Sequence, residues 1–212
     1  MTQTIAARKI KLADLKEQFN LRYSEDETFF PEWQESLPPI NEAERQALDR
    51  VKYNYLYLLE YPVMESIVKM VVLSPLLDLA GFYAPPFRVE GETSIQISAH
   101  DEGEIIQGSI DVLILQHQLW VTVIEAKNSE LSITKAIPQT LAYLLAAPNS
   151  TIPAFGIVLN GSECLFLKVR HREDGVYYGR SNLFSLLNQG NELYTVLQVL
   201  KRLGQMAIAP PS

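Results

Sequence analysis

Three ionisable residues stand at the ends of two apolar runs in IDVLILQHQLWVTVIEAK, residues 110–127. Asp111 begins the first run, and Glu125 and Lys127 close the second. Charged side chains are seldom buried unless they are paired or bind a metal. The segment therefore allows two interpretations: strand ends that merely reach water, or a site built where two strands meet.

The spacing of these residues favours a site. Glu125 and Lys127 are two apart, so in a strand they share one face, and the carbonyl of Ala126 lies near them. A turn at QHQ would pair the two runs and place Asp111 opposite residue 123 or 124, within about one residue pair of Glu125. Two carboxylates and a carbonyl suit the oxygen shell of Mg²⁺, for which Mn²⁺ is a substitute. With a lysine to orient metal-bound water, the group predicts metal-assisted phosphodiester hydrolysis.

The elements that would position these residues follow from the periodicity of the apolar positions. Alternation of period two, bounded by short polar breaks, predicts strands at 87–99, 104–116, 119–126, 153–160 and 163–170. Helical spacing and capping signals predict helices at 5–20, 42–60, 63–81 and 129–147, a short helix after Ser181-Asn182, and a last one from Asn191 to Met206. The first three strands should form an antiparallel meander, and Asn160-Gly161 should turn the last two into a hairpin.

This order of elements predicts an α/β fold. Its central β-sheet should be mixed, an antiparallel meander plus further strands, and flanked by helices. We expect an N-terminal helical extension over residues 1–60, the main domain over 61–206 and a tail over 207–212.

The pattern of Asp111 followed by Glu-Ala-Lys at 125–127 resembles the signature of the PD-(D/E)XK nuclease superfamily, which has the restriction-endonuclease-like fold. The order of helix, three-stranded meander, helix and strand is similar over roughly residues 60–170. Ile110 stands where the signature has its proline, a position that varies widely in the superfamily. The whole chain is also similar to short cyanobacterial proteins described as R-subunit-like nuclease domains of type I restriction enzymes, without the motor domain.

The resemblance implies a Mg²⁺-dependent endonuclease that hydrolyses DNA. It implies that Asp111 and Glu125 bind the metal, and that Lys127 positions and activates the attacking water. In that superfamily an acidic residue on the helix before the meander often joins the metal site, and Glu65 in VMESIVKM matches it. The alternative for Glu65 is a carboxylate favoured by the dipole at a helix start.

Gln139 and Tyr143 match a Q-x-x-x-Y motif of the branch that includes RecB-type nucleases and motor subunits of type I restriction enzymes. Residues four apart share one face of a helix, so this pair would contact substrate or support the site. The alternative is ordinary amphipathic packing. Since the chain has no G-x-x-x-x-G-K-[ST] loop, the resemblance covers a nuclease module without ATP-driven translocation.

Composition limits the partners and the compartment. The chain has 212 residues, one cysteine (Cys164), no apolar leader and no unbroken apolar run of membrane-spanning length, which predicts a cytoplasmic protein without membrane contact. Its net charge is −7, and residues 61–130 hold 10 acidic and 3 basic side chains. Such an acidic middle suits a cation site or a solvated face, and disfavours nonspecific binding to a polyanion.

Three functional alternatives therefore stay open. The first is a DNA endonuclease, for which cutting both strands at one site per chain would require a homodimer or two sequential nicks. The second is a catalytically silent accessory or nucleic-acid-binding module that keeps the nuclease fold. The third is a nuclease acting on branched DNA or RNA.

Two further groups have simpler interpretations. Lys168, Arg170 and Arg172 alternate along one strand and predict a solvated strand face rather than a contact to the DNA backbone. The tyrosines at 53, 55, 57 and 61 predict helix packing rather than a platform for stacking bases.

Overall fold

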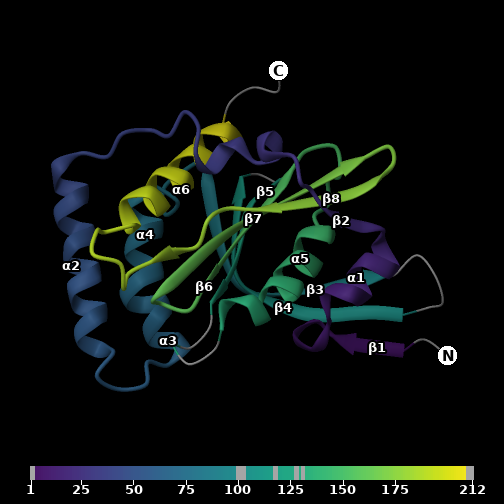
Figure 1. Cartoon of the computed structure of the whole chain (residues 1–212), viewed down its shortest axis with the longest axis horizontal. Coiled ribbons are helices and arrows are strands. Elements are labelled where there is room, and N and C mark those ends of the chain that lie inside the picture. The colour runs from purple at the N-terminus through teal and green to yellow at the C-terminus, as the bar shows by residue number, and fades with distance from the viewer. Residues whose placement is uncertain (1–2, 99–103, 117–118, 127–128, 130–131, 209–212) are drawn as a thin grey trace.

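The computed structural model describes residues 3–98, 104–116, 119–126, 129 and 132–208 of the chain. Within these residues all strands join one sheet, in the order β1-β4-β5-β6-β7-β8-β2, with β3 paired to β4 and β9 paired to β7 (Figure 1). The strands are β1 (Gln3–Ala6), β2 (Leu21–Tyr23), β3 (Phe87–Ser98), β4 (Glu104–Gln116), β5 (Leu119–Ala126), β6 (Ala154–Leu159), β7 (Glu163–Arg172), β8 (Gly175–Arg180) and β9 (Phe184–Ser185).

The sheet is mixed, as the sequence predicts. β3, β4 and β5 form the antiparallel meander, and β6, β7 and β8 form a second antiparallel run. The two runs are joined by a parallel pairing of β5 with β6. A parallel connection needs a crossover, and helix α5 (Ile137–Leu145) supplies it.

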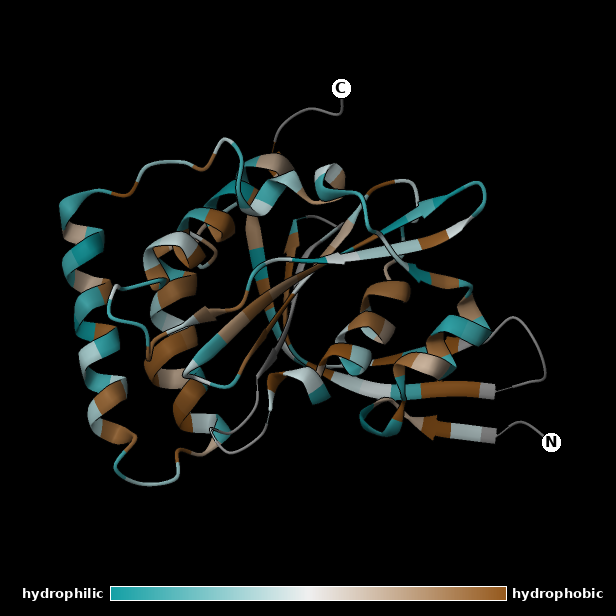
Figure 2. Cartoon of the chain, viewed as in Figure 1, coloured by the Kyte–Doolittle hydropathy of each residue, from teal (hydrophilic) through white to brown (hydrophobic). Residues whose placement is uncertain are grey.

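Helices cover both faces of the sheet, each over its own apolar cluster. On one face α2 (Glu42–Leu58), α4 (Ser74–Leu79) and α6 (Leu193–Ile208) enclose a core with side chains of β6 and β7. On the other face α1 (Leu12–Phe19) and α5 pack on β4, β6 and β7. Figure 1 shows α2, α4 and α6 grouped apart from α1 and α5, and Figure 2 shows the strands, α4 and α5 rich in apolar residues while α2 is largely polar.

Local signals define several boundaries. Asn41 and Glu44 form a capping box at the predicted start of α2: the Asn41 side chain accepts from the Glu44 N–H, and the Glu44 carboxylate accepts from the Asn41 N–H. Gly81, with φ of +82°, ends the helical segment that began at Glu65. These features were predicted correctly because they depend on neighbouring residues alone.

The helical segment before the meander contains a widened turn. It runs as α3 (Glu65–Val68), the π-helical segment η4 (Lys69–Leu73) and α4, and the Ser74 N–H donates to the Lys69 carbonyl five residues back. Pro75 offers a reason, because proline has no N–H and its ring clashes with the carbonyl four residues earlier. The wider turn keeps the segment continuous past this proline.

The N-terminal 60 residues are not the purely helical extension that the sequence predicts. β1 pairs in parallel with β4, and β2 pairs in parallel with β8. Within the predicted span 5–20 the α-helix covers only 12–19, preceded by a short 3-10 turn at 7–9. Strands of three or four residues are too short to show alternation, and their remote partners decide their structure.

Two C-terminal predictions are also corrected. The short helix expected after Ser181-Asn182 is wrong: this stretch holds the strand β9, which pairs with the start of β7. Strand β8 was not predicted. Helix α6 extends two residues past the predicted end at Met206, and 209–212 lie outside the described residues.

Candidate functional site

All but one of the predicted site residues lie on four elements of the fold. Lys127 lies outside the described residues. The others are Asp111 in the middle of β4, Glu125 and Ala126 at the end of β5, Glu65 at the start of α3, and Gln139 and Tyr143 on α5.

The register between β4, which holds Asp111, and β5, which holds Glu125, shifts by one residue along the pair. Toward the end of β4, Leu115 pairs with Trp120, but farther back Ile114 pairs with Thr122, and the register runs from there to Val112 opposite Ile124. Within the described residues this is the last pair between the two strands, and Asp111 and position 125 are the residues that follow it in β4 and β5. The simple hairpin predicted from the sequence has no extra residue in β5 and places Asp111 opposite position 123 or 124. A shift of one residue exchanges the two faces of a strand, so the irregularity sets which residues at the end of β5 lie nearest Asp111.

Asp111 and Glu65 converge on one cation, the ammonium of Lys69. Lys69 Nζ lies 3.0 Å from Asp111 Oδ1 and 2.8 Å from Glu65 Oε1. The Asp111 side chain is 17% exposed and that of Lys69 is 28% exposed, so this pair is shielded from bulk water. Because Asp111 lies on β4 and Glu65 on α3, the ammonium ties the helix to the sheet at the predicted site.

The charges around Lys69 alter its titration. Partial burial alone would lower the pKa of Lys69, but its hydrogen bonds to Glu65 and Asp111, together with their negative charges, raise that pKa overall. The ammonium form is therefore strongly favoured. Its position at the first residue of the π-helical segment η4 places the widened turn directly beside the carboxylates.

Lys69 was not predicted as a site residue, although one of its two contacts, the one to Glu65, could have been predicted from the sequence. Glu65 and Lys69 are four apart on a helix, a spacing that brings opposite charges together. The second contact, to Asp111, joins residues 42 positions apart and depends on how the helix packs on β4. No local pattern encodes that distance.

Gln139 and Tyr143 meet on α5 and continue as a hydrogen-bonded chain to β4. Gln139 Nε2 donates to Tyr143 Oη at 2.7 Å, and Tyr143 Oη donates to the Ser109 carbonyl at 2.9 Å. Tyr143 is 1% exposed, which makes it a supporting contact two residues before Asp111. Gly108 permits this approach, because a Cβ there would lie 2.8 Å from Tyr143 Oη.

The donor groups fit a hard divalent cation. Magnesium takes oxygen ligands and is usually bound by one or two carboxylates with several waters. Glu65 and Asp111 offer two carboxylates that already meet at a cation, and the backbone of Ala126 ends β5 in register with Leu159 of β6. Among the described residues, which exclude the side chain at position 125, no group of three or more His, Cys, Asp or Glu side chains is arranged as a metal site.

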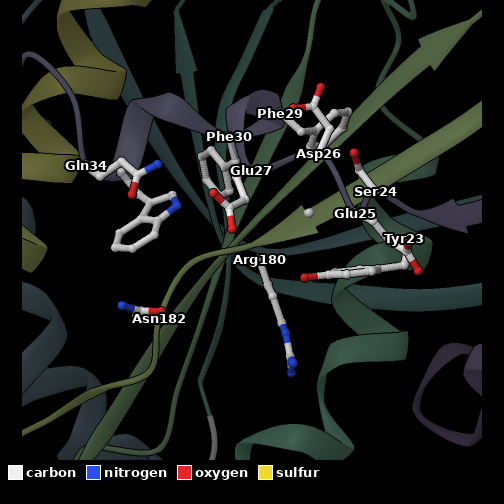
Figure 3. A pocket seen from close by; sticks show the side chains of 12 residues that line it. Tyr23, Ser24, Glu25, Asp26, Glu27, Phe29, Phe30, Gln34, Arg180 and Asn182 are labelled. Carbon is white, nitrogen blue, oxygen red and sulfur yellow. The ribbon is translucent and has the colours of Figure 1, made fainter.

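A separate hollow of about 370 Å³ lies between β2, β8 and the segment that follows β2. Figure 3 shows Tyr23 and Arg180 on its strand side and Glu27 and Phe30 on its loop side. No predicted site residue lines it. Its three carboxylates, at 25–27, outnumber the single guanidinium, which disfavours a phosphate-bearing ligand.

Cys164 is a core residue, and burial raises the pKa of its thiol. Two other predictions can be compared with the structure. Lys168 is buried rather than solvated. Of the four tyrosines on and after α2, only Tyr55 packs in the core, whereas those at 53, 57 and 61 are exposed.

Comparison with known proteins gives limited matches. No protein-family model and no curated protein matches the chain. Among solved structures, the chain is similar to a fragment assigned as an HsdR subunit of a type I restriction enzyme from Vibrio vulnificus YJ016, with 15% sequence identity and a TM-score of 0.40. The similarity covers 66% of this chain and 26% of that one.

Across the described part of the chain, no helix has both the length and the apolar character needed to cross a membrane.

Proposed function

We propose that the chain is a Mg²⁺-dependent nuclease of the restriction-endonuclease-like fold that hydrolyses DNA phosphodiester bonds. The observation that carries the proposal is the convergence of the Glu65 and Asp111 carboxylates on one cation, beside the end of β5. A mixed sheet with an antiparallel meander, preceded by the helix that holds Glu65 and followed by α5, agrees with this assignment.

Each residue has a proposed role. Asp111 and Glu125 hold the metal, with Glu65 and the Ala126 carbonyl completing the protein's share of the ligands. When bound, Mg²⁺ would lower the pKa of a water and stabilise charge on the phosphate. Lys127 orients the attacking water.

Gln139 and Tyr143 act from behind the site. Their hydrogen bonds hold the Ser109 carbonyl, and with it the stretch of β4 that carries Asp111. Because Tyr143 is buried, we assign this pair to positioning β4 rather than to contact with DNA.

The test is nicking of supercoiled plasmid with Mg²⁺ or Mn²⁺, compared between the wild type, Asp111→Asn and Glu125→Gln. We expect each substitution to lower the nicking rate roughly a hundredfold or more, since each removes charge that stabilises the transition state. Glu173→Gln, at an exposed carboxylate on the turn after β7, is the control and should nick like the wild type. Equal rates in wild type and Asp111→Asn would overturn the assignment. The same assay on branched DNA and on RNA identifies the substrate class.

A silent accessory module is the second candidate, and two observations favour it. Lys69 already balances part of the charge of Glu65 and Asp111, and the net charge of −7 opposes binding to a polyanion. A silent site would bind Mn²⁺ no more tightly than its Asp111→Asn variant.

Light scattering on the same samples tests whether the chain forms the homodimer that a double-strand cut would use.

A further inference from the structure

We propose that Lys69 is a resident counter-ion, which a divalent metal ion must displace in order to bind Asp111 and Glu65. This inference rests on the proposed function, because it takes these carboxylates as metal ligands. It adds a residue that the nuclease signature does not contain. In this arrangement the ammonium keeps the two carboxylates together while no metal is bound, and it sets how much metal is needed to load the site.

The position of the Lys69 ammonium between the two carboxylates supports this role. One nitrogen lies within hydrogen-bonding distance of an oxygen of Asp111 and an oxygen of Glu65, which come from different elements. Any divalent ion shared by these two oxygens would have to occupy the neighbourhood of that nitrogen. Two cations cannot share it, because their repulsion at such distances is large.

Lys69 also has a route out of the site. Its side chain is 28% exposed, and Glu65, on the outer side, is 40% exposed. A lysine ammonium is a point charge on a flexible four-carbon stem, so it can turn toward water without a change in the backbone. Metal loading therefore exchanges one bound cation for another rather than filling an empty charge pair.

A purely structural role for Lys69 predicts a different change in metal affinity. If Lys69 only fastened the helix to β4, its removal would lower stability and leave metal affinity unchanged or weaker, because the carboxylates would lose their alignment. If Lys69 competes with the metal, its removal makes the summed charge of Glu65, Asp111 and position 69 more negative, from −1 to −2, and must tighten metal binding. The sign of the change in metal affinity separates these roles.

The experiment is calorimetric titration of the full chain with Mn²⁺ alone at one fixed neutral pH. The variants are Lys69→Met, its polar analogue Lys69→Gln, and Lys69→Arg, which keeps the cation. We expect roughly tenfold tighter binding in the first two, an effect of the size of one partly screened charge, and binding close to wild type in Lys69→Arg. Lys16→Met, at an exposed lysine on α1, controls for net charge and should bind like the wild type. The gain should disappear in Lys69→Met/Asp111→Asn.

A second measurement needs no variant. In the wild type, displacement by Mn²⁺ should free the Lys69 ammonium and speed its acetylation by an amine-reactive ester, read by peptide mass spectrometry against Lys16 in the same sample. Slower or unchanged modification of Lys69 on Mn²⁺ binding would overturn displacement.

The outcomes distinguish the two proposals. Wild-type Mn²⁺ binding that requires Asp111, together with equal or weaker binding by Lys69→Met, refutes the counter-ion and leaves the nuclease assignment standing. Absence of Asp111-dependent binding in both the wild type and Lys69→Met refutes both. Tighter binding in Lys69→Met that depends on Asp111 supports the counter-ion.

Discussion

Lys168 lies in the interior on β7 and has all three of its ammonium donors satisfied. Its Nζ lies 2.8 Å from the Phe29 carbonyl and 2.6 and 2.8 Å from the two carboxylate oxygens of Glu32. The side chains are 4% and 10% exposed. Burial lowers the pKa of Lys168, although Glu32 acts in the opposite direction. The pair joins the segment before α2 to the centre of the sheet.

Removing one partner of this pair should be costly. Lys168→Met leaves the Glu32 carboxylate buried without its cation, and we expect it to lower the free energy of unfolding by about 3–5 kcal/mol. Urea denaturation measures the change. Replacing both partners, in Lys168→Met/Glu32→Leu, should recover most of it. Arg170→Met, at the exposed neighbour on the same face, should change stability by about 0.5 kcal/mol or less. A Lys168→Met protein as stable as the wild type would contradict this role.

Lys168 and Lys69 mark the limit of inference from single residues. Alternation along β7 correctly places Lys168, Arg170 and Arg172 on one face, but it cannot say that the segment holding Phe29 and Glu32 covers only the first of them. In the same way, the spacing places Asp111 at the predicted site and the resemblance to the nuclease superfamily implies Glu65 there, while the lysine between them depends on helix packing. Tertiary contacts decide which charges are paired.

At the scale of elements, turns and caps with a local cause were predicted well. The hairpin between β6 and β7 forms at Asn160-Gly161, with Gly161 at a φ of +91°. A Cβ on Gly161 would lie 2.4 Å from Tyr55 Oη, whose ring is fully buried and whose hydroxyl bonds the Asn160 carbonyl. This turn therefore needs glycine both for its backbone and for the close approach of α2.

Gly161→Ala should accordingly destabilise the fold. Left-handed backbone costs an alanine about 1–2 kcal/mol, and overpacking against Tyr55 adds about 1–3 kcal/mol. We expect a total loss of roughly 2–5 kcal/mol in chemical denaturation, with a matching fall in melting temperature. Gly190→Ala is the matched control, because a Cβ there meets nothing within 4 Å, and it should stay within about 0.5 kcal/mol of wild type. Equal losses in the two variants would show that the turn tolerates a side chain.

Elements with a remote cause were predicted poorly. The meander was recognised from alternation, but the register shift that leaves an extra residue in β5 between Trp120 and Thr122 has no local signature. The strands β1 and β2 exist because β4 and β8 offer unpaired edges. The predicted metal site therefore depends on a one-residue irregularity that the sequence pattern does not reveal.

At the scale of the whole molecule, the first 60 residues contribute to both faces of the sheet. Six of their apolar side chains belong to the core under α2, α4 and α6: Phe29, Phe30, Ile40, Leu48, Val51 and Tyr55. Four belong to the core under α1 and α5: Ala7, Ile10, Leu15 and Leu21. A fully buried large apolar side chain contributes about 1.5–3 kcal/mol, so six of them match the 5–15 kcal/mol by which a typical domain is stable.

We therefore expect residues 61–206 to fail as an independent domain, despite the boundary that the sequence predicts at 60/61. Expressed alone, this fragment loses part of the cover of both faces and leaves Lys168 without Glu32. It should show no cooperative urea transition and little near-ultraviolet circular dichroism, whereas the full chain should show both. Adding residues 1–60 as a separate peptide should restore the transition, because the missing contacts need no covalent link. If the fragment alone unfolds cooperatively, the boundary at 60/61 separates a true extension from the main domain.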